Sequence, residues 1–310
     1  MKKILYIGTI IMALMTILTV VTIIGLGNRA SVLDDTTINI VTSFYPMYIA
    51  TSNIINGADN VTLKCLASPE VGCLHDYQLT VNDMITLEKA DIFVINGGGM
   101  ESFLDKAINA YPDMMILNAS EELFKEEEAD LHEHEEHDHS HEENPHAWVS
   151  VSLHIKQIEK ITQGLKEYDP SNADIYEKNS KKYIESLDNL KVKMHEKLDF
   201  LTNKNVVMFH EAFHYFAEEF GLNIVAVIER EPGTSPSAKD VAEIIDMIRN
   251  ENVNAIFVEP QYLKTAANTI SNETDVAIYE LDPIVSGTFE NNAYLENMNK
   301  NLEVLLEALK

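Results

Sequence analysis

The chain has 310 residues, of which 45% are apolar, a share typical of globular proteins with substantial cores. At about 150 residues per domain, this length predicts about two domains. The 50 Asp and Glu residues outnumber the 23 Lys and Arg residues, so the formal net charge is −27. Because nucleic-acid phosphates bind clustered Lys and Arg, this charge argues against a nucleic-acid partner and favours cations or proteins.

The N-terminal segment, residues 1–30, has the features of an export signal. Two lysines precede an uncharged run from residue 4 to residue 28, which is long enough to cross the hydrocarbon core of a bilayer. Ordinary secretory signals have a shorter apolar stretch, so we expect an uncleaved signal anchor with its basic end inside. A signal peptide cleaved after Gly25-Leu26-Gly27 is the alternative. No cysteine precedes Cys65, so the expected tether is the helix itself rather than a lipid.

The chain has two cysteines, Cys65 and Cys73. Export would place them where disulfides persist, and a bridge between them would contribute roughly 2–3 kcal/mol in the chain-entropy model. The alternative is that one or both are thiolate ligands, since Cys73-Leu74-His75 brings a sulfur close to an imidazole. We expect the disulfide.

From residue 37 onward, short apolar runs alternate with helix-like segments. The runs are rich in Val, Ile and Phe, as buried strands are. They cover residues 38–42, 61–66, 92–95, 114–117, 206–209, 224–228, 255–258 and 276–281. Helical periodicity appears between most of them, over residues 80–89, 102–110 and 238–249. This alternation predicts an α/β protein with mostly parallel sheets.

Six of the eleven histidines lie in residues 131–148, interleaved with Asp and Glu. Neutral imidazole binds zinc, copper, nickel and iron, and a tract of imidazoles and carboxylates can hold such ions loosely. A solvated acidic loop is the alternative, although acidity alone requires no histidine. We therefore expect weak, auxiliary metal binding in the acidic loop 121–143. The histidines concerned are His132, His134, His137, His139 and His141.

One long helix is predicted over residues 171–200, which contain no Gly or Pro and carry apolar residues near helical spacing. It separates four predicted strands from four others. We therefore expect two α/β lobes, over residues 37–168 and 202–310, joined by a connecting helix within residues 169–201.

Candidate metal donors follow predicted strands in both lobes. His210, Glu259 and Asp282 each come directly after a strand of the second lobe, while His75 and His146 lie in loops of the first. Ligands of open α/β sheets bind beyond the carboxyl ends of the strands. A lone His beside an apolar run is often structural, and an Asp or Glu before Pro often belongs to a turn, so Glu259 is expected near the site or in a turn rather than as a ligand. The convergence of the other four predicts a metal site in a cleft between the lobes.

The stretch His210-Glu211-Ala212-Phe213-His214 satisfies the His-Glu-x-x-His pattern of zinc peptidases. In those enzymes two histidines one helical turn apart bind zinc and the glutamate activates water. Glu229 or Glu231 would supply the third ligand. The pattern requires both histidines on one helix, whereas His210 follows a predicted strand, and it leaves the first-lobe histidines unexplained. A peptidase is therefore the less favoured alternative.

From about residue 38 to its C-terminus the chain resembles the metal-specific substrate-binding proteins of ABC importers, a family that includes zinc and manganese receptors. The joint occurrence of its landmarks in order makes the resemblance specific. They are residues 39–47 (Asn-Ile-Val-Thr-Ser-Phe-Tyr-Pro-Met), His75-Asp76-Tyr77, residues 91–98, Asn144-Pro145-His146-Ala147-Trp148, His210-Glu211-Ala212-Phe213-His214-Tyr215-Phe216, Glu259-Pro260-Gln261 and Leu281-Asp282-Pro283.

The resemblance implies the metal ligands His75, His146, His210 and Asp282, two from each lobe, and a long helix between the lobes. Three imidazoles and one carboxylate favour zinc in a four-coordinate shell, and family members with a histidine where His210 stands tend to be zinc receptors. The chain departs from the family in Cys73-Leu74-His75, where Asp-Pro-His is usual, and in lacking the lipid-anchor cysteine common in bacteria without an outer membrane.

The implied function is that of an extracytoplasmic receptor without enzyme activity, which captures Zn²⁺ and delivers it to an ABC transporter permease. We expect a monomer, tethered by its N-terminal helix or secreted if the signal is cleaved. A manganese or broader divalent-metal receptor of the same family is one alternative. A zinc store or chaperone that uses the histidine-rich loop as its main site is another. Zinc binding should weaken as the pH falls through the histidine range, because the ligands must be neutral imidazoles.

Overall fold

The computed structural model describes residues 37–68, 71, 72, 74, 77–123, 144–229, 236–262 and 264–310. By its internal contacts, the chain from Ile38 to Lys310 forms one compact unit. The expected signal segment 1–30, Cys73, His75, Glu231 and the five loop histidines lie outside the described residues. Within the part that is described, no helix is long and apolar enough to cross a membrane.

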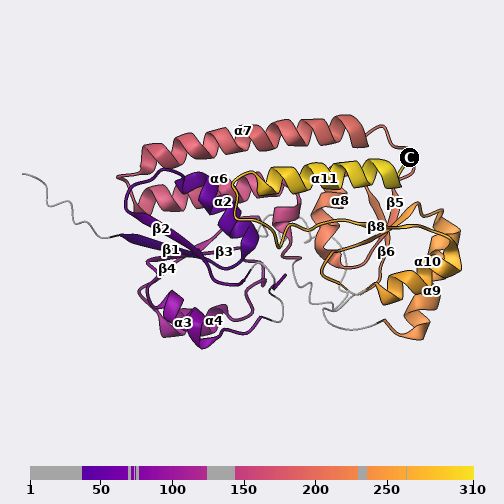
Figure 1. Cartoon of the computed structure of the whole chain (residues 1–310), viewed down its shortest axis with the longest axis horizontal. Coiled ribbons are helices and arrows are strands. Elements are labelled where there is room, and N and C mark those ends of the chain that lie inside the picture. Colours follow the sequence, from indigo (N-terminus) through magenta and orange to yellow (C-terminus); the bar gives the residue numbers. More distant parts are fainter. Residues whose placement is uncertain are drawn as a thin grey trace, which may run out of the picture. The chain divides into compact units, whose positions relative to one another are not determined.

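The first lobe contains a four-stranded parallel sheet with the strand order β2-β1-β3-β4 (Figure 1). Its strands are β1 (Ile38–Thr42), β2 (Val61–Cys65), β3 (Ile92–Ile95) and β4 (Met115–Asn118). The connecting helices are α2 (Tyr45–Ile55), α3 (Val81–Leu87) and α4 (Leu104–Ala110). Every residue of β3 is buried, as expected for an inner strand of a parallel sheet covered on both faces.

The second lobe repeats this topology with the strand order β6-β5-β7-β8, again all parallel. Its strands are β5 (Asn205–Met208), β6 (Asn223–Val227), β7 (Ala255–Val258) and β8 (Ile278–Glu280). Its helices are α8 (His214–Phe220), α9 (Ala238–Glu251) and α10 (Thr265–Thr274). Two α/β lobes with parallel sheets are therefore confirmed.

All eight predicted strands are present, but several ends differ from the predicted ones. β5 ends at Met208 and β8 at Glu280, so His210 and Asp282 lie two residues beyond their strands instead of directly after them. Glu259 directly follows β7, as predicted. Strand ends depend on which backbone groups find partners in the neighbouring strand, and an apolar run does not encode this.

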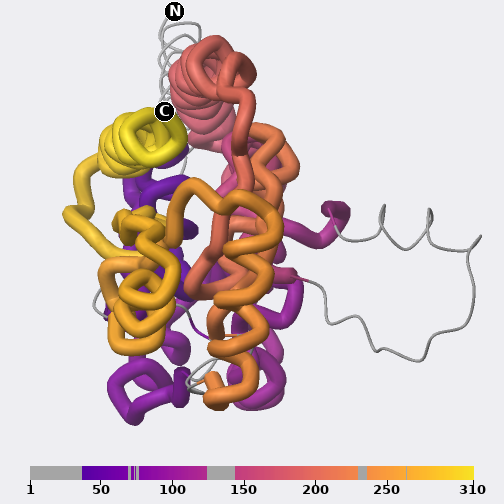
Figure 2. The backbone as a smooth tube through the Cα atoms, turned by 90° about the vertical axis from the view of Figure 1, so that its right-hand side faces the viewer, coloured from indigo at the N-terminus to yellow at the C-terminus, as the bar shows by residue number. Residues whose placement is uncertain are grey.

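The predicted long helix is α7 (Ala173–Leu198), which carries buried residues every three or four positions. These are Tyr176, Ser180, Tyr183, Leu187, Leu190, Met194 and Leu198. The helix packs on α2 and α6 (Val151–Tyr168) of the first lobe and on α8 of the second. The C-terminal helix α11 (Ala293–Ala308) lies beside it in both Figure 1 and Figure 2. α7 therefore joins the two lobes along one side.

A second connection runs between β8 and α11, where the chain leaves the second lobe and contacts α2 of the first. Ser52 Oγ donates to Asn291 Oδ1 at 2.7 Å, and Asn53 Nδ2 donates to Asn291 O at 2.8 Å. The ring of Phe289 lies 4.4 Å from that of Tyr48. This crossing segment begins next to Asp282, so the position of that candidate ligand depends on both lobes.

Candidate metal-binding site

His146 is held from the first lobe by the asparagine that precedes it. The residue is fully buried and lies just before the short 3₁₀ helix η2 (Ala147–Val149). Asn144 Oδ1 accepts the backbone N–H of His146 at 3.0 Å and lies 2.8 Å from its ring Nδ1. An amide oxygen can only accept, so Nδ1 carries the proton in the neutral ring. Nε2 is then the nitrogen whose lone pair can bind a cation.

His210 reaches the same place from the second lobe. It is 1% exposed and has extended backbone angles between β5 and the 3₁₀ helix η3 (Glu211–Phe213). Its ring centre lies 5.1 Å from that of His146, with the two ring planes at 81°. A cation bound 2.0–2.1 Å from one nitrogen of each ring in a tetrahedral shell would hold the ring centres about 5 Å apart. The structure therefore brings together two of the predicted ligands, one from each lobe, at a separation suited to a shared metal ion.

Asp282 is held by backbone hydrogen bonds on both sides of its peptide. Its N–H donates to Asn301 Oδ1 at 2.9 Å, and Asn301 Nδ2 donates to its carbonyl oxygen at 2.7 Å. The N–H of Ile284 donates to Oδ1 at 2.7 Å. Burial raises the pKa of the Asp282 carboxyl, and the Ile284 N–H and Lys300 oppose that rise. The Ile284 bond occupies Oδ1, so Oδ2 is the oxygen of Asp282 that could serve as a metal ligand.

Trp148 links the His146 segment to the Asp282 segment. Its indole Nε1 donates to the carbonyl oxygen of Pro283 at 2.8 Å, and its ring centre lies 5.1 Å from that of His146. The buried indole also packs edge-on against Phe44 at 5.0 Å. The segments that carry two predicted ligands from opposite lobes are therefore hydrogen-bonded to each other.

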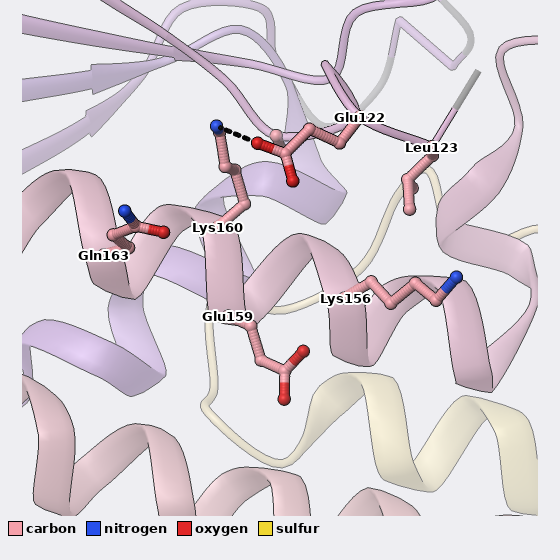
Figure 3. Close-up of a pocket in the computed structure, with 7 residues that line it drawn as sticks. Glu122, Leu123, Lys156, Glu159, Lys160 and Gln163 are labelled. Carbon is pink, nitrogen blue, oxygen red and sulfur yellow. Dashed lines mark hydrogen bonds and ion pairs between the residues drawn. The ribbon is translucent and has the colours of Figure 1, made fainter. Parts of the chain in front are cut away.

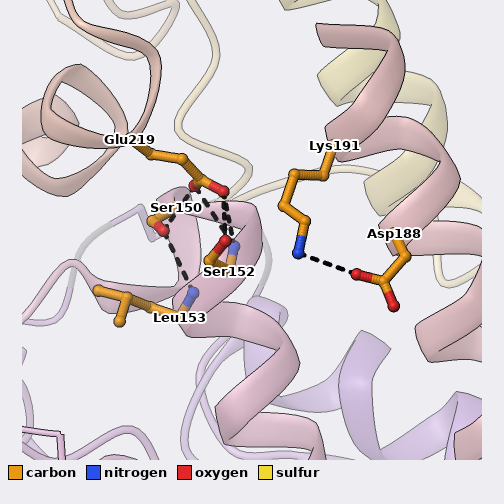
Figure 4. A network of polar contacts seen from close by, with 6 residues as sticks. All are labelled: Ser150, Ser152, Leu153, Asp188, Lys191 and Glu219. Atoms are coloured by element: carbon orange, nitrogen blue, oxygen red, sulfur yellow. Dashed lines mark hydrogen bonds and ion pairs between the residues drawn. The ribbon is translucent and has the colours of Figure 1, made fainter. Parts of the chain in front are cut away.

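Further bonds fix the His146 segment against the His210 segment. Asn144 Nδ2 donates to Glu211 O at 3.0 Å. The carboxylate of Glu219, on α8, accepts from Ser150 Oγ at 2.7 Å, from Ser152 Oγ at 2.6 Å and from Ser152 N at 3.1 Å (Figure 4). Ser150 is the N-cap of α6, so a carboxylate of the second lobe is hydrogen-bonded to the N-terminus of a first-lobe helix.

Two buried carboxylates accompany His210 at this edge of the sheet. Glu259 is 2% exposed and Glu229 is 6% exposed. Burial, and to a lesser degree the charges of Asp282 and Glu229, raise the pKa of Glu259 to about 8. The ring of Tyr262, three residues after Glu259, lies 5.7 Å from that of His210. The expectation that Glu259 lies near the site agrees with this placement.

The peptidase pattern does not take the geometry that its chemistry requires. His210 has φ −129° and ψ 162°, which is extended backbone, so it does not share a helix with His214. The side chain of His214 is 53% exposed and faces Glu218, 3.2 Å away. Because His214 points to solvent while His210 is buried, the two rings are not arranged as a helical zinc-ligand pair.

The described side chains include no group of three or more His, Cys, Asp or Glu close enough to share a metal ion. The expected first ligand, His75, lies outside the described residues, as does Cys73. Within the described residues the thiol of Cys65 is free and lies 3.1 Å from Ala67 O, and burial raises its pKa to about 12. The structure thus gives the expected Cys65–Cys73 bridge no support, and because Cys73 is not described, the bridge stays a prediction.

The described chain also has a cavity of about 350 Å³ on the outer face of α6, away from these residues (Figure 3). Its lining includes Lys156, Glu159 and Gln163, and Lys160 pairs there with Glu122 at 3.0 Å. Its lining contains no His or Cys, and its two lysines balance the charges of Glu122 and Glu159. This cavity is not the metal-binding site.

A family described as the periplasmic zinc-uptake complex component A, ZnuA, matches residues 40–308. The chain belongs to this family. The zinc-binding lipoprotein AdcA of Streptococcus pneumoniae is 32% identical over 287 residues, which are 89% of this chain and 56% of that relative. This chain thus spans little more than half of AdcA. The high-affinity zinc uptake system protein ZnuA of Bacillus subtilis is 32% identical over 288 residues, with 88% of each chain covered.

Solved structures of the family share the fold. The substrate-binding protein FpvC of Pseudomonas aeruginosa, in complex with Mn²⁺, has a TM-score of 0.76 and 27% identity, covering 88% of this chain and 98% of its own. The family assignment predicted from the motifs is therefore confirmed, and it is a family of metal-binding transport components rather than of enzymes.

The structure also reveals roles that sequence reasoning missed. Asn144 and Trp148 stood within a recognised motif, but nothing local indicated that one sets the ring tautomer of His146 and the other binds Pro283. Glu219 gave no signal at all, because its partners Ser150 and Ser152 lie more than 60 residues away in the chain.

Proposed function

We propose that this chain is an extracytoplasmic receptor that binds Zn²⁺ between its lobes and passes it to an ABC transporter permease. The observation that carries the proposal is the approach of His146 and His210 from opposite lobes to 5.1 Å, with the Nδ1 proton of His146 set by Asn144. Two buried imidazoles in this arrangement are suited to bind one borderline-soft cation.

His146 and His210 would each supply one nitrogen, Asp282 would supply Oδ2, and His75 would complete the shell. Four protein ligands fill a tetrahedral zinc site and leave no position for a reactive water, which distinguishes a receptor from a hydrolase. The site would thus bind and release its cargo without making or breaking covalent bonds in another molecule. Release would require the permease to separate the two lobes, because the ligands come from both.

Zinc is the preferred cargo because three imidazoles and one carboxylate favour a borderline ion over a hard one. A manganese or broader divalent-metal receptor is the second candidate, and the Mn²⁺ complex of FpvC is the observation that favours it. Competition between the two ions for the purified protein tests the choice. We expect zinc to displace manganese at equal concentrations.

The site assignment is tested by zinc titration of the full-length protein and of His210→Ala and Asp282→Ala. Each variant should lose more than about a hundredfold in zinc affinity, since each removes a ligand rather than a residue that supports one. His195→Ala is the control, because His195 lies on α7, its side chain is 38% exposed, and its described contacts are with Asp199 and with the ring of Phe220. Wild-type affinity in both site variants would show that the cation binds elsewhere.

The same titration separates a receptor from a zinc store. Deleting residues 132–141 removes the five loop histidines while leaving His146 in place. The receptor predicts one remaining tight site and the loss of only weaker binding. A store that depends on the loop would lose its tight binding.

We further propose that the protein faces the outside of the cytoplasmic membrane, tethered through its N-terminal segment or released from it, and that it works as a monomer. The lipoprotein name of AdcA and the periplasmic description of the family support an extracytoplasmic position. Fractionation of cells that express the full chain tests the tether, since an anchored protein sediments with membranes.

A further inference from the structure

The strand pairing of the second lobe places His210 between two buried carboxylates. Met208 pairs with Phe257 of β7 on one side and with Val227 of β6 on the other. The bonds continue past the strands: Phe209 N donates to Phe257 O, and Glu229 N donates to Phe209 O, both at 2.8 Å. The same register, continued to the next residues, sets His210 opposite Glu259 and opposite Glu229. Neighbouring parallel strands lie about 4.8 Å apart, and side chains at matched positions project to the same face.

Among the described residues, one carboxylate oxygen of Glu259 accepts a hydrogen bond and the other does not. Oε2 accepts from Gln261 Nε2 at 2.7 Å. Oε1 is buried and has no hydrogen-bond partner in the described part of the chain. A buried acceptor without a donor costs about 1–3 kcal/mol, so a fold retains one only where something compensates. Among the described residues, the charges that act on Glu259 are those of two acids, Asp282 and Glu229.

Glu259 begins a turn, and its own side chain is buried. Tyr262 N donates to Glu259 O at 3.2 Å, which closes the turn 259–262, and the ring of Tyr262 lies 5.7 Å from that of His210. The side chain of Gln261, which bonds Oε2, comes near the first lobe, since a Cβ built on Gly72 would lie 3.9 Å from Gln261 Cγ. The turn therefore keeps the buried Glu259 side chain beside His210, near the junction of the lobes.

We infer that Glu259 is the positioning residue for His210: when one ring nitrogen of His210 binds the cation, the other donates its proton to Glu259 Oε1. This inference rests on the proposed function. A metal-bound histidine commonly donates its second ring N–H to a carboxylate, which fixes the ring and strengthens it as a ligand. The bond would also supply Oε1 with the donor that it lacks, and it would place a negative charge beside the bound cation.

The test compares zinc affinity in the full-length protein and in Glu259→Met, which keeps the length of the side chain but has no strong acceptor. Loss of such a carboxylate partner costs about 10–100-fold in metal affinity. Glu259→Gln should lose less, because an amide oxygen still accepts the ring N–H. Glu280→Gln is the matched control, since it removes one exposed carboxylate at the end of the neighbouring strand β8 and should change affinity by less than about twofold. Wild-type affinity in Glu259→Met would overturn the inference.

A double-mutant cycle with His210→Ala shows whether Glu259 acts through His210. In the His210→Ala background, Glu259→Met should cost nothing further. A further tenfold loss there would mean that Glu259 contacts the cation itself, which would overturn the positioning role. If His210→Ala alone keeps wild-type affinity, the proposed metal site fails, and this outcome is separate from failure of the Glu259 inference.

Thermal unfolding without metal distinguishes positioning from a general structural role. Glu259→Met removes a buried oxygen that lacks a donor, and the bond that it breaks, from Gln261 Nε2 to Oε2, comes from an exposed residue that water can satisfy. The metal-free variant should therefore unfold at the wild-type temperature or above it. If Glu259→Met and the Glu280→Gln control both lower the unfolding temperature of the metal-free protein by the same amount, the inference is contradicted. A crystal structure of the zinc-loaded wild type gives a measurement that needs no variant. We expect Glu259 Oε1 about 2.7–2.9 Å from a His210 ring nitrogen, and a separation beyond about 3.5 Å would overturn the inference.

Discussion

At the scale of single residues, the site depends on small polar contacts that decide what each ligand can do. Asn144 Oδ1 binds Nδ1 of His146, and so leaves Nε2 as the nitrogen that can bind a cation. Asn301 and Ile284 fix the peptide and one carboxylate oxygen of Asp282. Residue types and motifs identified these two candidates in the sequence. Their hydrogen-bond partners were not predictable, because Asn301 lies 19 positions beyond Asp282, on the helix α11.

His154 gives a pH-dependent stability. It is completely buried on α6, stacked 4.3 Å from Tyr294, with Tyr183 and Gln157 as its other neighbours. Burial lowers its pKa to about 4. The unfolded chain takes up a proton near pH 6.5, so stability is complete above that pH and falls as the pH drops toward 4, by about 3 kcal/mol for this group.

Denaturant unfolding at several pH values between 7 and 4 measures this effect. Carboxylates elsewhere in the chain also titrate toward pH 4. The informative quantity is therefore the difference in the free energy of unfolding between the wild type and His154→Gln. The variant should show a shallower decline in the free energy of unfolding. Parallel curves for the two proteins would rule out His154 as the source.

At the scale of elements, the helix α6 begins at a contact between the lobes. Glu219 of α8 accepts hydrogen bonds from Ser150 and Ser152 in the first turn of α6, where a negative charge also interacts favourably with the helix dipole. Glu219→Ala should lower the free energy of unfolding by about 1–3 kcal/mol, since it leaves these donors without their acceptor. It should also weaken zinc binding, because His146 precedes α6 and His210 precedes α8.

The neighbouring residue provides the control for that prediction. Glu218 is exposed on the same helix and pairs only with His214 among the contacts described. Glu218→Ala should change stability by less than about 0.5 kcal/mol. Equal effects of the two substitutions, measured by denaturant unfolding and zinc titration, would mean that the contact between the lobes has no special role.

Periodicity predicted some elements well and missed others. The eight strands and α7 were recognisable because apolar runs and a helical stripe survive in the local sequence. α2 was not predicted, since seven of its eleven residues are buried and it has little polar face to create an amphipathic pattern. Its burial arises from α6, α7 and α11, which pack around it from distant parts of the chain.

At the scale of the whole molecule, the two lobes are linked by α7, by the segment between β8 and α11, and by the bonds around His146. We expect them to unfold in one transition, and zinc to raise its temperature. At a free zinc concentration 100 times the Kd, the stabilisation should be about 2.7 kcal/mol.

Calorimetry with zinc and then with a chelator measures that shift. His210→Ala should abolish the response to zinc while keeping the single transition of the metal-free protein. Two separate transitions, only one of which responds to zinc, would show that the cation does not bind between the lobes.

The sequence by itself determined the α/β alternation, the long helix, the acidic character and the types of metal donor, because these depend on local composition and spacing. Only the tertiary structure decided which donors meet. His146 and His210 are 64 positions apart, and their approach depends on the strand order β6-β5-β7-β8 and on hydrogen bonds between the lobes. In the sequence, Glu259 is recognisable only as a residue before a proline. The same strand order places it, buried, beside His210. Pairing between distant segments leaves no periodic trace in the chain, so this part of the site could be seen only once the sheet was assembled.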